Sequence, residues 1–432
     1  MSLISWGLYP RIENRVFKFT TISNLKQTIK ENNGLIPFGN GRSYGDSALS
    51  RKIISINSHD YFISFDETKG LLHIQAGALL SDILDAYVSK GWFLQVTPGT
   101  KLITVGGAIA SDVHGKNHHI GGCFSECVEE FNIMLPNGNI AVCSKDNNSE
   151  LFRATCGGMG LTGVILDAKI YLKKINSSQI AQTTIKTKNL KETFKAFEEY
   201  KHLPYSVAWI DCLAKGADIG KCLLMVGDFK NDGKLKYKSK KQLSIPFTFP
   251  SFALNNWSVR AFNWLYYGKS PYGVSKQSVG IDTFFYPLDA IGHWNRIYGN
   301  GGFTQYQFIL PKEDSYKGLE EILTLISNSG KGSFLAVLKL YGKENENYLS
   351  FPIEGYSLAL DFKIEDGLFE LLDRLDEVVV KYGGRIYLTK DVRVSKEVFE
   401  QGYSKIDKFR EFREKNNMVE KFSSLQSKRV GI

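Results

Sequence analysis

Three glycine-rich passages divide the first 176 residues into short segments, and this spacing constrains the fold more than any other feature of the chain. Between these passages, runs rich in β-branched and aromatic residues alternate with brief stretches of helical periodicity. The expected strands are residues 34–39, 52–57, 71–77 and 92–99. The apolar spacing from Leu80 to Tyr87 predicts a helix that ends at Gly91. The pattern is typical of an α+β fold.

The chain has 432 residues, which is more than one hydrophobic core usually supports, so we expect two domains. The glycine density falls after "VILDAKIYLKKI", which predicts a boundary near residue 176. Beyond that point residues 303–311 are expected to form a strand and residues 316–329 a helix. Apolar residues at helical spacing in 395–417 predict a terminal helix that packs on a domain.

Composition narrows the class of protein and of partner. Hydrophobic residues make up 43% and charged residues 23%, as in soluble globular proteins, and no run reaches the roughly 18 apolar residues of a membrane span. The formal charge of +9 favours an anionic partner, either a phosphorylated ligand, an anionic membrane surface or nucleic acid. No helix-turn-helix, zinc-finger or RNA-recognition pattern accompanies the charge, so no nucleic-acid partner is expected.

The beginning of the chain and its cysteines bear on the compartment. The first residues lack a positively charged opening, and Pro10, Arg11 and Glu13 interrupt them before an apolar stretch of signal-peptide length develops. Six cysteines are few for this length and fit a reducing compartment. We therefore expect a cytoplasmic location.

A stretch of aromatic residues between 247 and 267 admits two interpretations. Its aromatic side chains include Phe249, Phe252, Trp257, Phe262, Trp264 and Tyr266. Amphipathic aromatics among basic residues suit a membrane interface or a greasy ligand, whereas an ordinary core segment is the commoner explanation.

Two nucleotide-binding motifs are present only in part. "GGMGLTG" matches G-x-G-x-x-G at Gly158, Gly160 and Gly163, but a dinucleotide-binding turn needs a strand before the glycines and a helix after them. Here a helix is expected before the glycines and a strand after them. "GKS" at 268–270 has Asn263 where a P-loop needs its first glycine. Neither a Rossmann site nor a nucleoside triphosphate site is indicated.

Two other passages carry groups suited to ligand chemistry. "PFGNGRSYGDS" follows a predicted strand, and its glycines would let backbone amides form a concavity for an anion, although such loops are often plain tight turns. "DVHGKNHH" at 112–119 concentrates three of the seven histidines. His114 and His118 have the spacing of zinc ligands on a helix, but Gly115 and Asn117 disfavour that helix. A loop that borders a cofactor or substrate is favoured over a metal site, and no metal is expected.

Together these passages resemble the FAD-binding (PCMH-type) domain of the vanillyl-alcohol-oxidase type of flavoenzymes. Within that family, "GNGRSYGD", "TPGTKLITVGGAIASDVHGKNHH", "GGMGLTGVI" and the late "IYLTKD" are most similar to the decaprenylphosphoryl-ribose 2-oxidases, essentially end to end. The resemblance implies a two-domain α+β fold with an inserted antiparallel-sheet substrate domain. It places the FAD-binding domain at 1–176, the substrate-binding domain at 177–384, and at 385–432 a C-terminal segment that returns to the FAD domain.

The resemblance also implies site residues. The implied FAD-binding residues are Gly39, Asn40, Gly41, Arg42, Ser43, Tyr44, Thr97, Pro98, Gly99, Thr100, Gly106, Gly107, Ala110, Asp112, His114, Gly115, Gly158, Gly163 and Tyr387. The implied substrate-binding residues are Lys116, Gln305, Gln307, Lys339 and Lys390. The implied catalytic residues are Lys390, His114 and Tyr44. Relatives with covalent FAD have histidine at the position of Arg42, so non-covalent FAD is implied here; mycobacterial members have cysteine at the position of Ala359.

The activity implied is oxidation of the C2 hydroxyl of a polyprenylphosphoryl pentose to a 2-keto sugar, the first half of an epimerisation. A separate NAD(P)H-dependent short-chain reductase would complete it, and the lipid-linked substrate implies peripheral contact with the inner face of the plasma membrane. A lysine such as Lys390 would stabilise the developing oxyanion, and His114 or Tyr44 could assist proton removal. Two alternatives remain at this point: an aldonolactone or alditol oxidase acting on a soluble sugar, and a basic binding protein for lipid phosphates or nucleic acid without catalysis.

Overall fold

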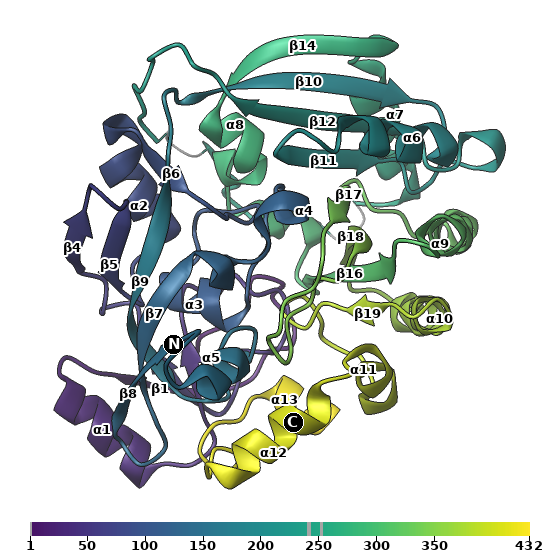
Figure 1. Cartoon of the computed structure of the whole chain (residues 1–432). Helices are drawn as coiled ribbons and strands as arrows, with labels where there is room; N and C mark the ends of the chain where they lie inside the picture. Colours follow the sequence, from purple (N-terminus) through teal and green to yellow (C-terminus); the bar gives the residue numbers. More distant parts are fainter. Residues whose placement is uncertain (1, 240–242, 251–253) are drawn as a thin grey trace.

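The computed structural model describes residues 2–239, 243–250 and 254–432, and within these ranges the strands form four sheets. Figure 1 shows the N-terminal elements, in purple and blue, on one side of a large mixed-colour sheet and helices α9 and α10 on its other side. The expected α+β architecture is confirmed.

The N-terminal part begins with a small parallel sheet. Its strands, in spatial order, are β1 (Arg15–Lys18), β3 (Lys52–Ser55) and β2 (Leu35–Phe38). Parallel neighbours need a crossover, which α1 (Ile22–Glu31) supplies between β1 and β2. Thr21 caps α1 by accepting a hydrogen bond from the backbone amide of Asn24. The first glycine-rich loop follows β2 directly.

A six-stranded antiparallel sheet packs beside it. Its strands are β4 (Phe62–Asp66), β5 (Leu71–Gln75), β6 (Trp92–Leu94), β7 (Val128–Met134), β8 (Ile140–Ser144) and β9 (Val164–Lys174). The central strand β9 pairs with β5, β6 and β7. The short helices of this part are α2 (Leu80–Tyr87), α3 (Val105–Ala110), α4 (His118–Gly121) and α5 (Ser149–Thr155).

Local sequence signals explain two of these elements. The helix predicted from Leu80 is confirmed, and Asp82 caps it by accepting from the amide of Leu79. The α-helix ends at Tyr87, earlier than expected, and a 3-10 turn over Val88–Lys90 follows it to Gly91, whose φ of 84° suits glycine. The glycines of "GGMGLTG" lie between α5 and β9, so the expected helix-before-strand order is also confirmed and no Rossmann turn exists there.

The larger antiparallel sheet has eight strands. In sequence they are β10 (Gln179–Thr187), β11 (Tyr205–Ile210), β12 (Cys222–Phe229), β14 (Gly273–Gly280), β16 (Phe303–Pro311), β17 (Ala336–Tyr341), β18 (Gly355–Lys363) and β19 (Arg385–Ile386). In space the order is β14-β10-β12-β11-β17-β18-β16-β19. A two-stranded ribbon of β13 (Leu243–Ser244) and β15 (Ile291–Gly292) lies outside it.

Helices cover one face of the eight-stranded sheet. Contacts join α6 (Leu190–Tyr200) to β10 and β12, and α9 (Ser315–Ser329) and α10 (Leu368–Lys381) to β16. These helices are amphipathic, and α10 buries four leucines, Leu368, Leu371, Leu372 and Leu375. The remaining helices of this part are α7 (Asn256–Gly268) and α8 (Ile281–Phe285). The opposite face of the sheet is thereby left to border the N-terminal part.

The prediction of a single terminal helix over 395–417 is wrong. The chain forms α11 (Lys396–Gly402) and α12 (Ile406–Lys415), followed by α13 (Leu425–Val430). Glycine at 402 favours helix poorly, and Tyr403 then turns inward so that its hydroxyl donates 2.8 Å to the carbonyl of Ile386. α12 and α13 pack on the N-terminal part, where the buried guanidinium of Arg413 on α12 donates to the carbonyl of Leu161, whereas α11 contacts β19 and α10.

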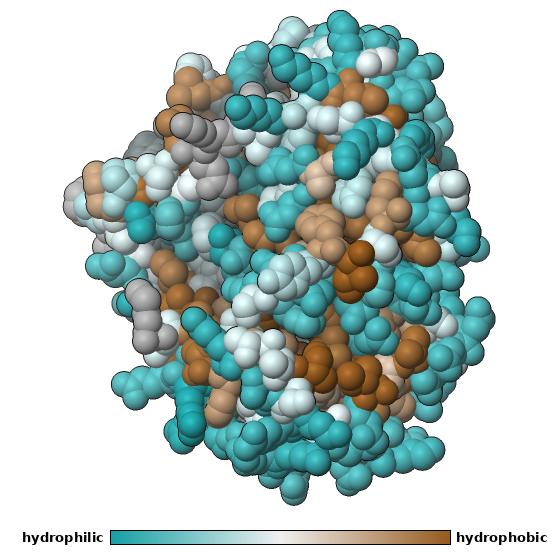
Figure 2. All heavy atoms as spheres, turned by 90° about the vertical axis from the view of Figure 1, so that its left-hand side faces the viewer, coloured by the Kyte–Doolittle hydropathy of each residue, from teal (hydrophilic) through white to brown (hydrophobic). Residues whose placement is uncertain are grey.

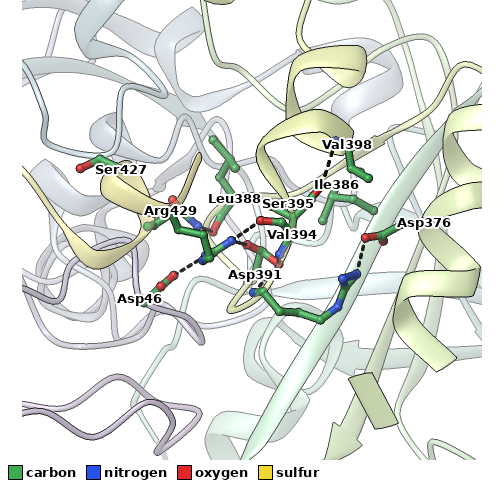
Figure 3. A network of polar contacts seen from close by, with 12 residues as sticks. Asp46, Asp376, Ile386, Leu388, Asp391, Val394, Ser395, Val398, Ser427 and Arg429 are labelled. Atoms are coloured by element: carbon green, nitrogen blue, oxygen red, sulfur yellow. Dashed lines mark hydrogen bonds and ion pairs between the residues drawn. The ribbon is translucent and has the colours of Figure 1, made fainter. Parts of the chain in front are cut away.

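An ionic network fixes the segment between β19 and α11. Arg429 on α13 lies between two buried carboxylates, at 2.8 Å from Asp46 and 3.0 Å from Asp391, as Figure 3 shows. Asp391 also accepts from the amide of Val394. Since Asp46 follows the first glycine-rich loop, this network locks the C-terminal segment onto that loop.

The molecular surface and the thiols complete the description. Within the described ranges no helix is long and apolar enough to cross a membrane. All six cysteines are buried free thiols. On the face shown in Figure 2, apolar side chains form patches separated by hydrophilic ones.

Candidate active site

One cavity of about 700 Å³ lies between the glycine-rich loops and the uncovered face of the eight-stranded sheet. Its lining is unusually cationic for an enclosed space. The positively charged lining residues are Arg42, Lys116, Lys269, Lys339 and Lys390, and among the described residues Asp289 is the one carboxylate in the lining. Such an imbalance favours an anionic ligand.

The first glycine-rich loop forms part of the wall with its backbone. The amides of residues 39–43 donate to no other residue in the described part of the chain. Gly41 has a φ of 62°, and Gly39 lies so close to Thr104 that a Cβ would be 2.3 Å from its hydroxyl oxygen. Successive free amides of this kind form a concavity for phosphate oxygens. Arg42 adds a guanidinium, which lies 4.3 Å from the ring of Trp6.

The second passage contributes a short helix and a loop. Thr104 caps α3 by accepting from the amide of Gly107, and the turn brings Gly106 against Ala76. No atom lies within 4 Å of where a Cβ would stand on Gly99, which faces the cavity. A flat ligand can therefore lie directly on this backbone.

Most of the candidate residues border this cavity, but four do not: Thr97, Asp112, Gly115 and Gly158. These four hold the loops instead. Asp112 is fully buried and accepts from Asn345, Asn347 and Ser350 at 2.7–2.8 Å, which ties the loop before His114 to residues that follow β17.

Gly115 and Gly158 allow close backbone crossings. A Cβ on Gly115 would lie 2.6 Å from the carbonyl oxygen of Thr97, and one on Gly158 would lie 2.0 Å from that of Ala154. Thr97 itself shares a 2.7 Å hydrogen bond with the hydroxyl of Tyr286. Of the third passage, Gly160 and Gly163 reach the cavity.

The three histidines of the octet have different surroundings. His118 accepts from the amide of Gly342 and contacts Cys123, while His119 donates to the carbonyl of Leu203. His114 alone borders the cavity. Among the described residues no group of three His, Cys, Asp or Glu side chains is placed to hold a metal ion.

His114 is held as a neutral hydrogen-bond donor. Its Nε2 accepts from the amide nitrogen of Gln307 at 3.2 Å, so its proton is on Nδ1. Burial, with a further contribution from Lys339, lowers the pKa of His114 well below its ordinary value. Nδ1 is buried and has no partner among the described residues. A buried donor without a protein partner is what a bound cofactor or substrate would satisfy.

Lys390 follows β19 and lies over the ring of Tyr44, with its ammonium nitrogen 3.5 Å from the ring centroid. Burial lowers the pKa of Lys390, and the buried carboxylate of Asp361 opposes that shift. Asp361 accepts from the side-chain amide of Gln305 at 2.5 Å. Burial raises the pKa of Asp361 in turn. The ammonium of Lys390 is thus stabilised by the aromatic face of Tyr44 and by the electrostatic attraction of Asp361.

Two further lysines share the cavity. Lys116 donates to the carbonyl of Phe284, and burial, together with Lys339, lowers its pKa to about 7. Burial lowers the pKa of Lys339 to about 8, and its ammonium has no hydrogen bond or ion pair with any described residue.

These features fit a cofactor that carries a pyrophosphate and a flat ring. The free amides of the first glycine-rich loop and the cationic lining suit the pyrophosphate, and the unpartnered N–H of His114 can donate to the ring or to a substrate. The profile of a family described as "FAD binding domain" matches residues 15–144, which include the first two glycine-rich passages. The decaprenylphosphoryl-beta-D-ribose oxidase of Mycolicibacterium smegmatis is 35% identical over 414 residues, or 92% of this chain and 89% of that protein.

The chain belongs to the decaprenylphosphoryl-β-D-ribose oxidase family. It is an FAD-dependent oxidoreductase, and the expected cofactor and enzyme class are confirmed. An uncharacterised Streptomyces coelicolor protein is 29% identical over 82% of this chain and 100% of its own length. A putative D-arabinono-1,4-lactone oxidase of Neurospora crassa is 30% identical, but over 30% of this chain and 23% of its own length. The likeness to lactone oxidases is thus confined to a smaller part of the chain.

Sequence reasoning missed two residues of the decaprenylphosphoryl-β-D-ribose oxidase site. The carboxylate of Asp361 raises the pKa of Lys390, and Trp209 on β11 lines the cavity. A signal for Asp361 existed: in "GYSLALDF" it is a charged residue two positions after Ala359, and the strand period of two puts both on one face. Trp209 gave no comparable signal, because tryptophan is also a common core residue.

Proposed function

We propose that this chain oxidises the C2 hydroxyl of a polyprenylphosphoryl pentose, similar to decaprenylphosphoryl-β-D-ribose, to the 2-keto sugar. The observation that carries the proposal is a single cavity with the glycine cradle on one wall and polar side chains on the other. These side chains are His114, Gln305, Gln307, Lys339 and Lys390. The relative in M. smegmatis, which is a decaprenylphosphoryl-β-D-ribose oxidase by name, supports the choice of substrate.

The cofactor would be held by the loops that surround the cradle. The free amides of 39–43 and the guanidinium of Arg42 suit its pyrophosphate, while Gly99, Gly107 and Tyr387 offer flat surfaces to its ring. Thr97, Asp112, Gly115 and Gly158 would act indirectly, by holding those loops in place. With arginine rather than histidine at 42, we propose non-covalent binding. When bound, FAD supplies the acceptor for the hydride that leaves C2.

As hydride leaves C2, the C2 hydroxyl must lose its proton, which can pass to a water in the cavity. The protein must orient the alcohol and stabilise the alkoxide character that this proton loss gives to the oxygen. Lys390 is suited to this because its ammonium is fixed against Tyr44 and backed by Asp361. His114 can donate from Nδ1 but cannot accept there, so it would orient the substrate or cofactor. Burial raises the pKa of Tyr44 well above its ordinary value, so its phenol stays protonated and does not serve as the base.

A lipid-linked substrate requires access to a membrane, and α7 offers a surface for it. Trp257 is 84% and Trp264 75% exposed, so the interpretation of this stretch as core does not hold for them. Tyr266 and Lys269, at the end of α7, border the cavity. Phe249 is half-buried, and Phe252 lies outside the described residues. We propose peripheral contact of this surface with the inner face of the plasma membrane.

The 2-keto product requires a second enzyme if epimerisation is the outcome. We propose an NAD(P)H-dependent short-chain reductase as the partner. The six free thiols of this chain agree with a reducing, cytoplasmic location. The soluble-sugar alternative is disfavoured because the apolar lining residues Val207, Trp209 and Met225 would then have no apolar group of the substrate to contact.

The test is an absorption spectrum of the purified protein before and after acid precipitation, followed by anaerobic addition of polyprenylphosphoryl ribose. We expect a yellow protein that releases its FAD on precipitation and bleaches with this lipid. Bleaching with free aldonolactones or alditols but not with the lipid would overturn the proposed substrate.

A further inference from the structure

The cavity face of the eight-stranded sheet changes character along the order of its strands. Gln307 on β16 is in register with Ala359 on β18, Ala359 with Val337 on β17, and Val337 with Trp209 on β11. All four side chains line the cavity, so this row of residues crosses the face of the sheet that forms one wall of the cavity, which we call the floor. At nearly 5 Å between strands, the row spans about 15 Å.

Polar groups occupy one end of this floor. Gln305 and Gln307 on β16 and Ser357 on β18 are buried there, next to Lys390. Gln307 donates to His114, and Gln305 to Asp361. This end therefore suits the hydroxyl groups of a sugar.

Apolar groups occupy the middle of the sheet, on β11 and β12, whereas Gln182 on β10 and Gln277 on β14 line the cavity further along the strand order. Val207 and Trp209 on β11 and Met225 on β12 line the cavity, and Val207 is in register with Met225. The indole N–H of Trp209 is satisfied by the carbonyl of Phe334, so its ring presents an apolar surface. Tyr266 of α7 packs on that ring with centroids 4.8 Å apart, which extends the apolar wall to the exposed aromatic helix.

Two lysines lie between the polar residues on β16 and β18 and the apolar residues on β11 and β12. Lys339 lies on β17 in register with Ser357, two residues after Val337 on the same face. Lys116 lies next to β11, because its carbonyl accepts from the amide of Ser206. No carboxylate is paired with either of them among the described residues. Leu338, the neighbour of Lys339, pairs with Ala208 on β11, two residues from Ser206, so both lysines reach the cavity at the same part of the sheet. Two like charges held together in an enclosed space are stabilised by an anion between them.

We propose that Lys339 and Lys116 bind the phosphate of the substrate, and that Val207, Trp209 and Met225 hold the first isoprenoid units on their way to α7. This assignment rests on the proposed function and gives each part of the substrate a position along the strands of the sheet. The pentose lies over β16 and β18, the phosphate at β17, and the chain over β11 and β12. The amides of 39–43 belong to a different loop and remain for the cofactor.

The experiment uses the FAD-loaded protein and three probes: farnesyl monophosphate, farnesol and inorganic phosphate. Affinities are measured by calorimetry for wild type, Lys339→Met, Trp209→Ala and Lys317→Met, the last a control on the exposed surface of α9. Loss of a charge-assisted contact to phosphate should weaken farnesyl monophosphate about tenfold or more in Lys339→Met. Farnesol binding should stay within about twofold of wild type in this variant, because the apolar wall is untouched.

Trp209→Ala should weaken farnesol and farnesyl monophosphate together and leave inorganic phosphate unaffected. Lys339→Arg should retain most of the affinity for farnesyl monophosphate. If Lys339→Met fails to bind FAD, Lys116→Met is measured in its place. Equal affinities of wild type and Lys339→Met for farnesyl monophosphate, or no preference of wild type for it over farnesol, would overturn the assignment.

A parallel assay separates this inference from the proposed function. One possible pair of results is that polyprenylphosphoryl ribose bleaches the wild-type flavin anaerobically while the affinity for farnesyl monophosphate does not depend on Lys339 or Lys116. This pair of results would refute the phosphate site and leave the proposed function standing. If the lipid sugar does not bleach the protein, the proposed function fails whatever the probes show.

Discussion

The ammonium of Lys390 lies 3.5 Å from the centre of the Tyr44 ring, although the two residues are 346 positions apart in the sequence. The amide of Tyr44 donates to the carbonyl of Thr389. Arg429 joins Asp46, two residues after Tyr44, to Asp391, the residue after Lys390. The first glycine-rich loop and the lysine are therefore one rigid unit, and the position of the cation is fixed relative to the cradle.

Replacing Lys390 by methionine should lower kcat about 100- to 1,000-fold, because it removes the charge that stabilises the developing oxyanion. FAD content should not change, since the cradle is formed by other residues. Steady-state kinetics and the flavin-to-protein ratio check both statements. Lys390→Arg, which keeps the charge but not the geometry, should lose less; equal kcat for wild type and Lys390→Met would refute the role.

Asp361→Asn should shift the pH dependence of kcat/KM. Asp361 raises the pKa of Lys390, so its removal lowers that pKa. Activity that needs the ammonium form is lost as the pH rises through this pKa, and the alkaline limb should therefore move to lower pH in the variant. A full pH profile with a prenylphosphoryl pentose measures it. A merely structural role for Asp361 predicts a lower rate at every pH with an unmoved limb.

Gly45→Ala should uncouple the two halves of the site. A Cβ at this position would lie 1.7 Å from the carbonyl oxygen of Asp391, so the loop and the lysine segment must separate. Overpacking of this kind costs about 1–3 kcal/mol. We expect a lower Tm and loss of activity. Gly268→Ala, where no atom lies within 4 Å of the new Cβ, is the matched control and should keep both. An active, stable Gly45→Ala protein would contradict the proposed coupling.

The double variant Trp257→Ser and Trp264→Ser should bind anionic liposomes about tenfold or more weakly, because each exposed indole can bury apolar area in the interface. Co-sedimentation with vesicles that contain phosphatidylglycerol measures the change. The control is the double variant Tyr61→Ser and Ile63→Ser, which removes two exposed apolar side chains, one on β4 and one directly before it. Unchanged binding by the tryptophan variant would exclude α7 as the membrane contact.

Local patterns in the sequence were enough for several elements. α2 and the 3-10 turn after it have their own cap at Asp82 and their own stop at Gly91. The order of α5, the glycines and β9 follows from periodicity alone. The terminal helix was mispredicted because its break depends on Tyr403 reaching the carbonyl of Ile386, a contact that periodicity does not contain.

The sequence by itself determined that glycine-rich loops follow short strands, that the chain is basic, and through its motifs that it binds FAD. These are properties of residue type and near spacing, which act over a few positions. Tertiary structure decided the electrostatics of the site. Asp361 raises the pKa of Lys390, Asp112 holds a loop instead of lining the cavity, and Lys339 has no carboxylate partner among the described residues. Such properties depend on burial and on pairing between distant strands, because a charge acquires its altered pKa and its partner only when the sheet and the loops have enclosed it.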